Sequence, residues 1–207
     1  MRLTFKELQK RLGYGVAGIT ACLVSHEHQD HAKAAAQLLK KRRAGIHERG
    51  HGRCPQGRNG CGKTSSKAGD VRGSGTWTVV PFRTFHNTDE PLGFLIEDGR
   101  TKERLLWAVD TANLGVTADK LTYIAVECNY EERLLNRSDR IPSVLKDRIR
   151  HSHFEVSDVI RWLHKQDLSG VLTIWLLHLS AGNSRAEAWQ RRFEREFPGI
   201  EIRICPE

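Results

Sequence analysis

The 207-residue sequence contains no apolar run long enough to span a bilayer, and its first residues lack the apolar core of a signal peptide. Its five cysteines are an odd number without regular spacing, which argues against a disulfide framework. These absences exclude a membrane-spanning or secreted protein and indicate a cytoplasmic one. A chain of this length fits one domain with a substantial core, so we expect a single domain over residues 1–207.

Residues 47–74 lack aliphatic side chains almost completely, since Val71 is the only one beyond alanine. The segment is also rich in glycine, and we expect it to be disordered and to form neither a strand nor an amphipathic helix. It holds six basic and two acidic residues, so it carries +4 of the net charge of +8 and leaves +4 to the rest of the chain. The remaining surplus still favours a polyanionic partner.

Two patterns inside this segment imitate ligand sites. Residues 57–64 satisfy the phosphate-binding pattern G-x-x-x-x-G-K-[ST], but no apolar strand leads into them and no helix follows, so we reject a phosphate-binding loop. Cys54 and Cys61, with His47 and His51 nearby, match no familiar zinc-binding spacing.

The chain does contain a dense group of metal-ligand side chains, His26-x-His28-x-Asp30-His31, directly after the apolar residues 19–24. Imidazole nitrogen and carboxylate oxygen are the ligands that zinc and similar divalent metals prefer. If this stretch is extended, His26 and His28 point to the same side, because side chains alternate with period two. A solvated polar loop is the alternative, and this density of ligands argues against it.

Periodicity and capping signals predict a mixed α/β chain. Thr4 is a candidate cap for a first helix, and Ser152 with Glu155 reads as a capping box before a later one. We predict helices over 5–12, 31–43, 141–149, 155–166 and 184–197, and strands over 19–24, 77–85, 93–97, 104–109, 123–128, 171–177 and 200–204.

Five blocks in one order resemble the metallo-β-lactamase fold superfamily of metallo-hydrolases. They are the histidine motif, residues 81–94 around His86, residues 105–111 ending in Asp110 and Thr111, residues 126–130, and residues 177–180 around His178. The branch they resemble contains the bacterial WalJ/YycJ-type proteins and their phage-associated relatives. The resemblance implies an α/β fold of the αββα sandwich type, here without the N-terminal strand pair of such proteins.

The resemblance also implies two divalent metal ions, zinc or alternatively manganese. Its ligand set would be His26, His28 and His86 for one ion, Asp30, His31 and His178 for the other, and Asp110 between them. Asp30 and His153 would be the catalytic side chains, while Glu127 and Asn129 would support the ligands. Read singly, His86 is compatible with a hairpin position, Asp110 with a helix cap, and His153 with an exposed residue beside a cap.

The function that the resemblance implies is hydrolysis by a metal-activated water, with phosphodiesters in DNA, RNA or small molecules as the leading substrates. His153 precedes an expected helix start, whose free N–H groups favour a phosphate. One alternative is a hydrolase of lactones, thioesters or β-lactams. Another is a degenerate product without activity, because the chain reaches its metal motif early, as after a truncated or misplaced start. In addition, codons can be chosen for residues 47–57 whose next frame encodes the family-like string MSAGTADALK, as after a frameshift.

Overall fold

A computed structural model describes residues 4–16, 19, 21–28, 37–38, 69, 72–74 and 76–205, with the backbone alone for residues 72–74. The chain divides into two compact units, Met1–Ser66 and Lys67–Glu207. Within the described ranges, no helix is both long and apolar enough to cross a bilayer.

The first unit begins with α1 (Phe5–Arg11), the helix predicted from the cap at Thr4. The Thr4 side chain accepts a hydrogen bond from the Glu7 backbone N–H, and the Glu7 carboxylate accepts one from the Thr4 backbone N–H at 2.7 Å. This reciprocal pair satisfies donors that a helix start leaves unpaired. Of the predicted helix over 31–43, the structure describes residues 37 and 38, which are both helical.

The strand predicted over 19–24 is wrong for its described residues, which have no strand conformation. A strand needs a neighbour to pair its N–H and C=O groups. Nothing among the described residues supplies that neighbour, and Leu23 keeps 43% of its surface exposed. An apolar run therefore marked an extended approach to the histidine motif, but not a strand of a sheet.

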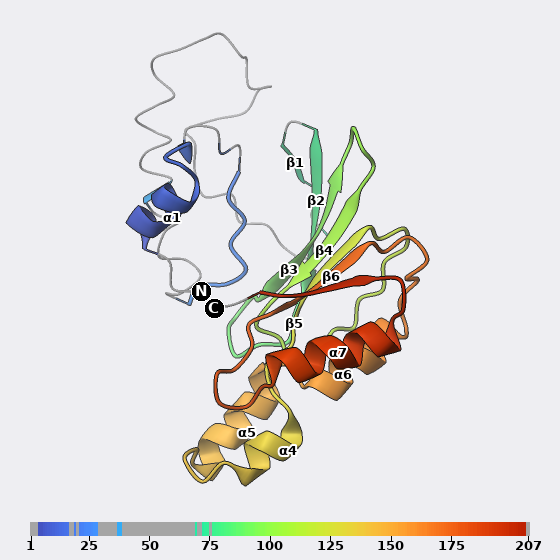
Figure 1. The fold of residues 1–207 in the computed structure, drawn as a ribbon. Coiled ribbons are helices and arrows are strands. Elements are labelled where there is room, and N and C mark those ends of the chain that lie inside the picture. Colours follow the sequence, from blue (N-terminus) through green and yellow to red (C-terminus); the bar gives the residue numbers. More distant parts are fainter. Residues whose placement is uncertain are drawn as a thin grey trace. The chain divides into compact units, whose positions relative to one another are not determined.

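The second unit is built on a seven-stranded sheet in which the strands lie side by side in sequence order (Figure 1). The predicted strands after residue 76 are confirmed, with ends shifted by up to two residues. The strands are β1 (Arg72–Ser74), β2 (Trp77–Arg83), β3 (Leu92–Asp98), β4 (Arg104–Ala108), β5 (Tyr123–Glu127), β6 (Thr173–Leu177) and β7 (Glu201–Ile204). Neighbours from β1 to β4 pair antiparallel, and those from β4 to β7 pair parallel.

Strand β1 corrects the expectation that residues 47–74 form no strand, since their last three residues pair with β2. Pairing uses backbone groups that every residue except proline possesses in full, so an exposed edge such as that of β2 can order a segment of low apolar content. The rest of that segment lies outside the described residues apart from Gly69, and so do residues 57–64 and both candidate ligand cysteines.

Two amphipathic helices, α6 (Val156–Leu163) and α7 (Ala186–Glu196), cover one face of the parallel strands (Figure 1). Alternate strand residues point into this core, among them Leu106, Ile124, Val126, Ile174 and Leu176, each 0% exposed. Burial of each such side chain contributes roughly 1.5–3 kcal/mol. The predicted α/β class is confirmed, and one sheet is present among the described residues.

A helical hairpin joins β5 to the core helices and consists of α4 (Glu132–Arg137) and α5 (Ser143–Ser152). Helix α4 was not predicted, because it has six residues and buries only Leu135. The predicted capping box is wrong: Ser152 ends α5 and donates its hydroxyl to the Arg148 carbonyl. Glu155 caps α6 instead, and its carboxylate accepts from the N–H groups of Ser157 and Asp158.

Candidate metal centre

Three neighbouring parallel strands deliver polar side chains to one edge of the sheet. Glu127 is the last residue of β5, His178 directly follows β6, and Asp110 lies two residues beyond β4. The registers Ala108 with Val126 and Glu127 with Leu177 keep the carboxyl ends of these strands level. That edge is where open sheets with parallel strands place their ligand sites.

His153 joins these three residues from the end of α5. In the group Asp110, Glu127, His153 and His178, one nitrogen or carboxylate oxygen of each residue lies within 4.8 Å of those of the others. Two of the members are buried carboxylates and two are half-buried imidazoles. Sequence reasoning selected Asp110 and His178 as ligands and His153 as a catalytic residue, and the structure brings all three together around Glu127.

Glu127 is the centre of this group and is 0% exposed. Its Oε1 accepts from Nδ1 of His153 at 2.7 Å and from Nδ1 of His178 at 2.8 Å. Its Oε2 accepts from the backbone N–H of Thr111, beside Asp110, at 2.6 Å. Both oxygens are therefore engaged by protein donors. A carboxylate that holds the proton on Nδ1 directs Nε2 to be the ligand or acid–base atom, which is the usual support of a metal-binding histidine.

The backbone places Asp110 and His178 in the left-handed region, with φ of 52° and 56°. Such a conformation costs about 1–3 kcal/mol in a residue with a side chain. Asn129 helps to hold it, because its Nδ2 donates to the carbonyl of His178 at 2.7 Å. Strain concentrated at two strand ends is typical of residues kept for a site rather than for packing.

The electrostatics of the group follow from its two buried carboxylates. Burial alone lowers the pKa of His178, but hydrogen bonds and attraction from Asp110 and Glu127 outweigh it and raise this pKa to about 10. His178 is thus a cation at neutral pH and balances part of the carboxylate charge. A divalent cation can replace that proton with a larger positive charge.

His86 lies beside the group, with its ring centroid 5.7 Å from that of His153. Its Nδ1 is 2.9 Å from the Ser152 carbonyl, which fixes this nitrogen as the donor. Burial lowers the pKa of His86, although the Ser152 carbonyl and nearby carboxylates act in the opposite direction. A neutral imidazole with the proton on Nδ1 is the form that binds a metal through Nε2.

In the first unit, the rings of His26 and His28 meet edge to face with centroids 4.8 Å apart. Ser25 Oγ lies 3.0 Å from Nδ1 of His26. This contact between the rings agrees with the expectation that both point to the same side of the chain. Asp30 and His31, the other members of the motif, lie outside the described residues.

The helix start after His153 does not offer free N–H groups to a phosphate, contrary to our expectation. The Glu155 carboxylate already occupies the N–H groups of Ser157 and Asp158, and its other oxygen accepts from the Glu132 backbone at 3.3 Å. A phosphate at this position would also meet a negative charge. Any anion recognition must come from other groups.

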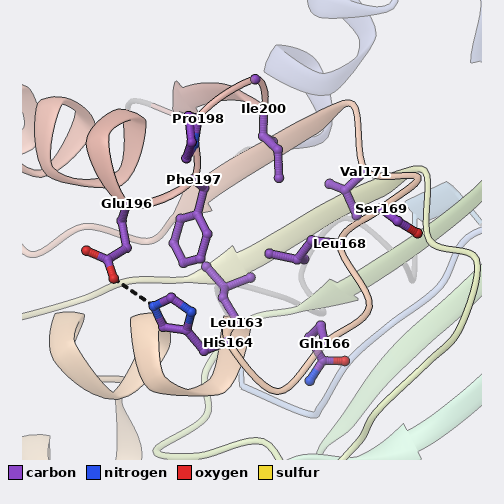
Figure 2. A pocket seen from close by; sticks show the side chains of 11 residues that line it. Leu163, His164, Gln166, Leu168, Ser169, Val171, Glu196, Phe197, Pro198 and Ile200 are labelled. Carbon is purple, nitrogen blue, oxygen red and sulfur yellow. Dashed lines mark hydrogen bonds and ion pairs between the residues drawn. The ribbon is translucent and has the colours of Figure 1, made fainter.

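A separate pocket of about 510 Å³ lies at the opposite edge of the parallel strands (Figure 2). Val171 and Ile200, just before β6 and β7, form part of its lining, and Phe197 contributes an aromatic face. Across it, Nε2 of His164 lies 2.7 Å from Oε1 of Glu196. The side chains that line it offer no cluster of metal ligands, so the candidate centre is the group at the carboxyl edge.

The donor set of that group fits a divalent metal. It combines imidazole nitrogen with carboxylate oxygen, the set that zinc and related ions bind, and it concentrates negative charge in a buried place. Asp110 and His178 would hold the ion, and Glu127 would orient both histidines from behind.

The fold agrees with that of a solved metallo-β-lactamase fold protein, YhfI from Bacillus subtilis, at a TM-score of 0.64 and 16% identity over 97% of this chain and 80% of that one. This chain has the metallo-β-lactamase fold. No family model and no curated protein matches the sequence.

Two other proteins share the metallo-β-lactamase fold with this chain. A diphosphatase of the PhnP family matches at a TM-score of 0.52 and 12% identity, over 98% of this chain and 74% of that one. CmlA, a diiron β-hydroxylase from Streptomyces venezuelae, matches at 0.50 and 13%, over 86% of this chain and 42% of that one. Because a diphosphatase and a diiron β-hydroxylase share it, the fold alone fixes neither the reaction nor the metal.

Proposed function

We propose that this protein is a metal-dependent hydrolase of phosphodiesters, in DNA, RNA or small molecules. The observation that carries the proposal is the group of Asp110, Glu127, His153 and His178 at the ends of adjacent parallel strands. The fold is shared with a described diphosphatase, which supports a phosphate-directed reaction. We further propose, from the five sequence blocks, that the chain belongs to the WalJ/YycJ-type branch, and, from its odd number of irregularly spaced cysteines, that it works in the cytoplasm.

The metals would be two divalent ions, zinc or alternatively manganese. Asp110 and His178 are the proposed ligands that lie in this group, and His26, His28, Asp30, His31 and His86 remain the predicted others. When bound, such ions would supply Lewis-acid chemistry and a nucleophilic water at neutral pH, so that no side chain would need to attack the substrate. Asp30 stays a predicted catalytic residue.

His153 is the proposed proton donor to the leaving oxygen. Glu127 Oε1, 2.7 Å from its Nδ1, keeps a proton on that nitrogen and turns Nε2 into the exchanging atom. An alkoxide leaving group gains most from such a donor, because it departs as a strong base unless it is protonated.

The test measures metal content and turnover on one preparation. We expect bound metal and cleavage of a phosphodiester reporter or single-stranded oligonucleotide, and His153→Ala should lower the rate about 100-fold or more while metal content stays constant. His151→Ala is the matched control, since His151 is exposed on the same helix and its one hydrogen bond within the described part of the chain is to the Asp147 carbonyl.

The same assay includes a lactone, a thioester and a β-lactam. Turnover of these carbonyl substrates alone would replace the proposal by the carbonyl-hydrolase alternative. A folded, metal-loaded chain that cleaves none of the substrates would support the degenerate product. Equal rate losses in His153→Ala and His151→Ala would remove His153 from the reaction.

A further inference from the structure

Hydrogen bonds from Arg150 link the two helices of the α4–α5 hairpin. Arg150 donates from Nη2 to Glu132 at 2.9 Å and to Asn136 at 2.6 Å, and from Nη1 to Asp147 at 2.7 Å. Lys146 adds a bond from Nζ to the Asn136 carbonyl at 3.0 Å. These contacts tie the helices into one rigid piece, and they neutralise Arg150 within it.

Three other arginines of the hairpin, Arg137, Arg140 and Arg148, are exposed. No carboxylate of the described residues lies within 4.0 Å of their guanidinium groups, in contrast to Arg161, Arg191 and Arg203 elsewhere on this unit. We call these three the hairpin arginines. An unpaired, weakly hydrated guanidinium on a rigid support is suited to phosphate.

The hairpin arginines belong to the segment that ends at the candidate centre. Arg148 lies one helical turn before Ser152, whose carbonyl contacts His86 and whose neighbour His153 contacts Glu127. Helix α5 has ten residues and is therefore about 15 Å long, and Arg140 precedes its start. Positive charge thus extends from one turn away from the centre to well beyond the reach of a mononucleotide.

Exposed apolar side chains lie in the same segment, near the start of α5. Val144 is 80% exposed and Leu145 is 43% exposed, and in sequence both stand between Arg140 and Arg148. Guanidinium planes and exposed apolar groups together offer surfaces on which unpaired bases can stack while phosphates bind the charges. A duplex would keep its bases away from such contacts.

We infer that the hairpin arginines bind a single-stranded nucleic acid whose scissile phosphodiester lies at the candidate centre. This inference rests on the proposed function and narrows its substrate class, because a strand of several nucleotides is long enough to reach both places. The hairpin then supplies the anion recognition that the occupied start of α6 does not.

The test is a binding measurement without turnover. Fluorescence anisotropy of a labelled single-stranded 12-mer, with chelator present, compares the wild type with R137Q/R140Q/R148Q. Loss of three phosphate contacts should weaken binding about tenfold or more and reduce the slope of log K against log salt by about 2. R161Q/R191Q/R195Q on α6 and α7 removes the same net charge and is the matched control, with a change below about twofold expected.

Equal weakening by both triple variants would overturn the inference, because it would indicate attraction by net charge alone. Binding of anionic lipid vesicles with no binding of the 12-mer would also overturn it. Thermal melting checks that both variants fold, and the single variant R148Q must weaken binding in the same direction.

Turnover separates this inference from the proposed function. A protein that cleaves nothing but binds the 12-mer through the hairpin arginines keeps the inference and loses the proposed function. A protein that cleaves a small diester reporter, but binds the 12-mer equally well with and without the hairpin arginines, keeps the proposed function and loses the inference. If both hold, R137Q/R140Q/R148Q should raise KM for the oligonucleotide and leave the small reporter unchanged.

Discussion

His26 and His28 stand two residues apart on one stretch of chain, whereas Asp110, Glu127, His153 and His178 come from four segments. The first pair needs only an extended backbone to place its rings together. The second group exists only if three strands pair in the right register and α5 ends at the right residue. The pair His26 and His28 can therefore bind a metal even where the tertiary structure is perturbed. The group of Asp110, Glu127, His153 and His178 can bind one only when the sheet and α5 are correctly folded.

The largest expected effect is that of Asp110→Asn on metal binding. The change keeps the shape of a side chain that is 3% exposed but removes its charge, so we expect metal affinity to fall about 100-fold or more. His28→Gln, in the local pair, should cost less. Elemental analysis and chelator competition measure both, with exposed Asp119→Asn as the control. Full metal content in Asp110→Asn would remove it from the site.

Glu127→Gln should weaken metal binding by about 10–100-fold without removing a predicted ligand. An amide cannot accept from both imidazoles through one atom and from the Thr111 N–H through the other, because its nitrogen is a donor. In the metal-loaded protein, nitrogen NMR should show the Nδ1–H tautomer disturbed in His153 and His178, while the signals of His26 and His28 stay unchanged. Unchanged tautomers would show that Glu127 does not orient the assembled set.

The metal-free protein should lose stability as the pH rises. The pKa of His178 is about 10 in the folded protein against an ordinary 6.5, so its stabilisation is complete below about pH 6.5 and is lost as the pH approaches 10. The expected slope is at most about 1.4 kcal/mol per pH unit. Urea titrations at several pH values give the free energy of unfolding of the wild type and of His178→Gln, and the difference between them isolates this contribution. If the free energy changed with pH in the same way in both proteins, the prediction would be contradicted.

The same proton links metal binding to pH. Metal must displace a proton from His178 near neutral pH, so binding should release protons in calorimetry with buffers of different ionisation enthalpy. Proton release that is identical in the wild type and His178→Gln would contradict the linkage.

The smallest effects should come from the two helix caps. Glu155 caps α6, is 9% exposed, and also accepts a hydrogen bond from the Glu132 backbone N–H. Glu155→Ala removes these bonds and should lower the free energy of unfolding by about 1–2 kcal/mol. Thr4→Ala should cost about 0.5 kcal/mol, because α1 buries none of its residues. Thermal denaturation of the two variants measures both losses of stability. A larger loss for Thr4→Ala than for Glu155→Ala would contradict the prediction.

The sequence predicts most of the fold because alternation and apolar runs determine β2 to β7, and amphipathic spacing determines α5 to α7. Strand β1 was missed because edge pairing needs no apolar side chain. Helix α4 was missed because one buried leucine gives no periodicity. The strand expected before His26 shows the reverse error, since an apolar run is not a strand without a partner.

For the site, the resemblance selected Asp110, His153 and His178, and named Glu127 only as a supporting residue. Its bonds to two histidines depend on the register of β5 with β6 and on where α5 stops. Neither quantity is local in the sequence. The capping error at Ser152 has the same origin, because Ser152 and Glu155 are both plausible caps until packing chooses between them.

The order of strands along the sheet also has a consequence for synthesis on the ribosome. Each strand from β2 to β7 pairs with the one made just before it, so the sheet can grow in order as the chain emerges. Asp110 and Glu127 leave the exit tunnel well before His178 does. The nascent chain therefore carries both carboxylates without the imidazole of His178 until β6 is made, and solvent must stabilise their charge during that interval.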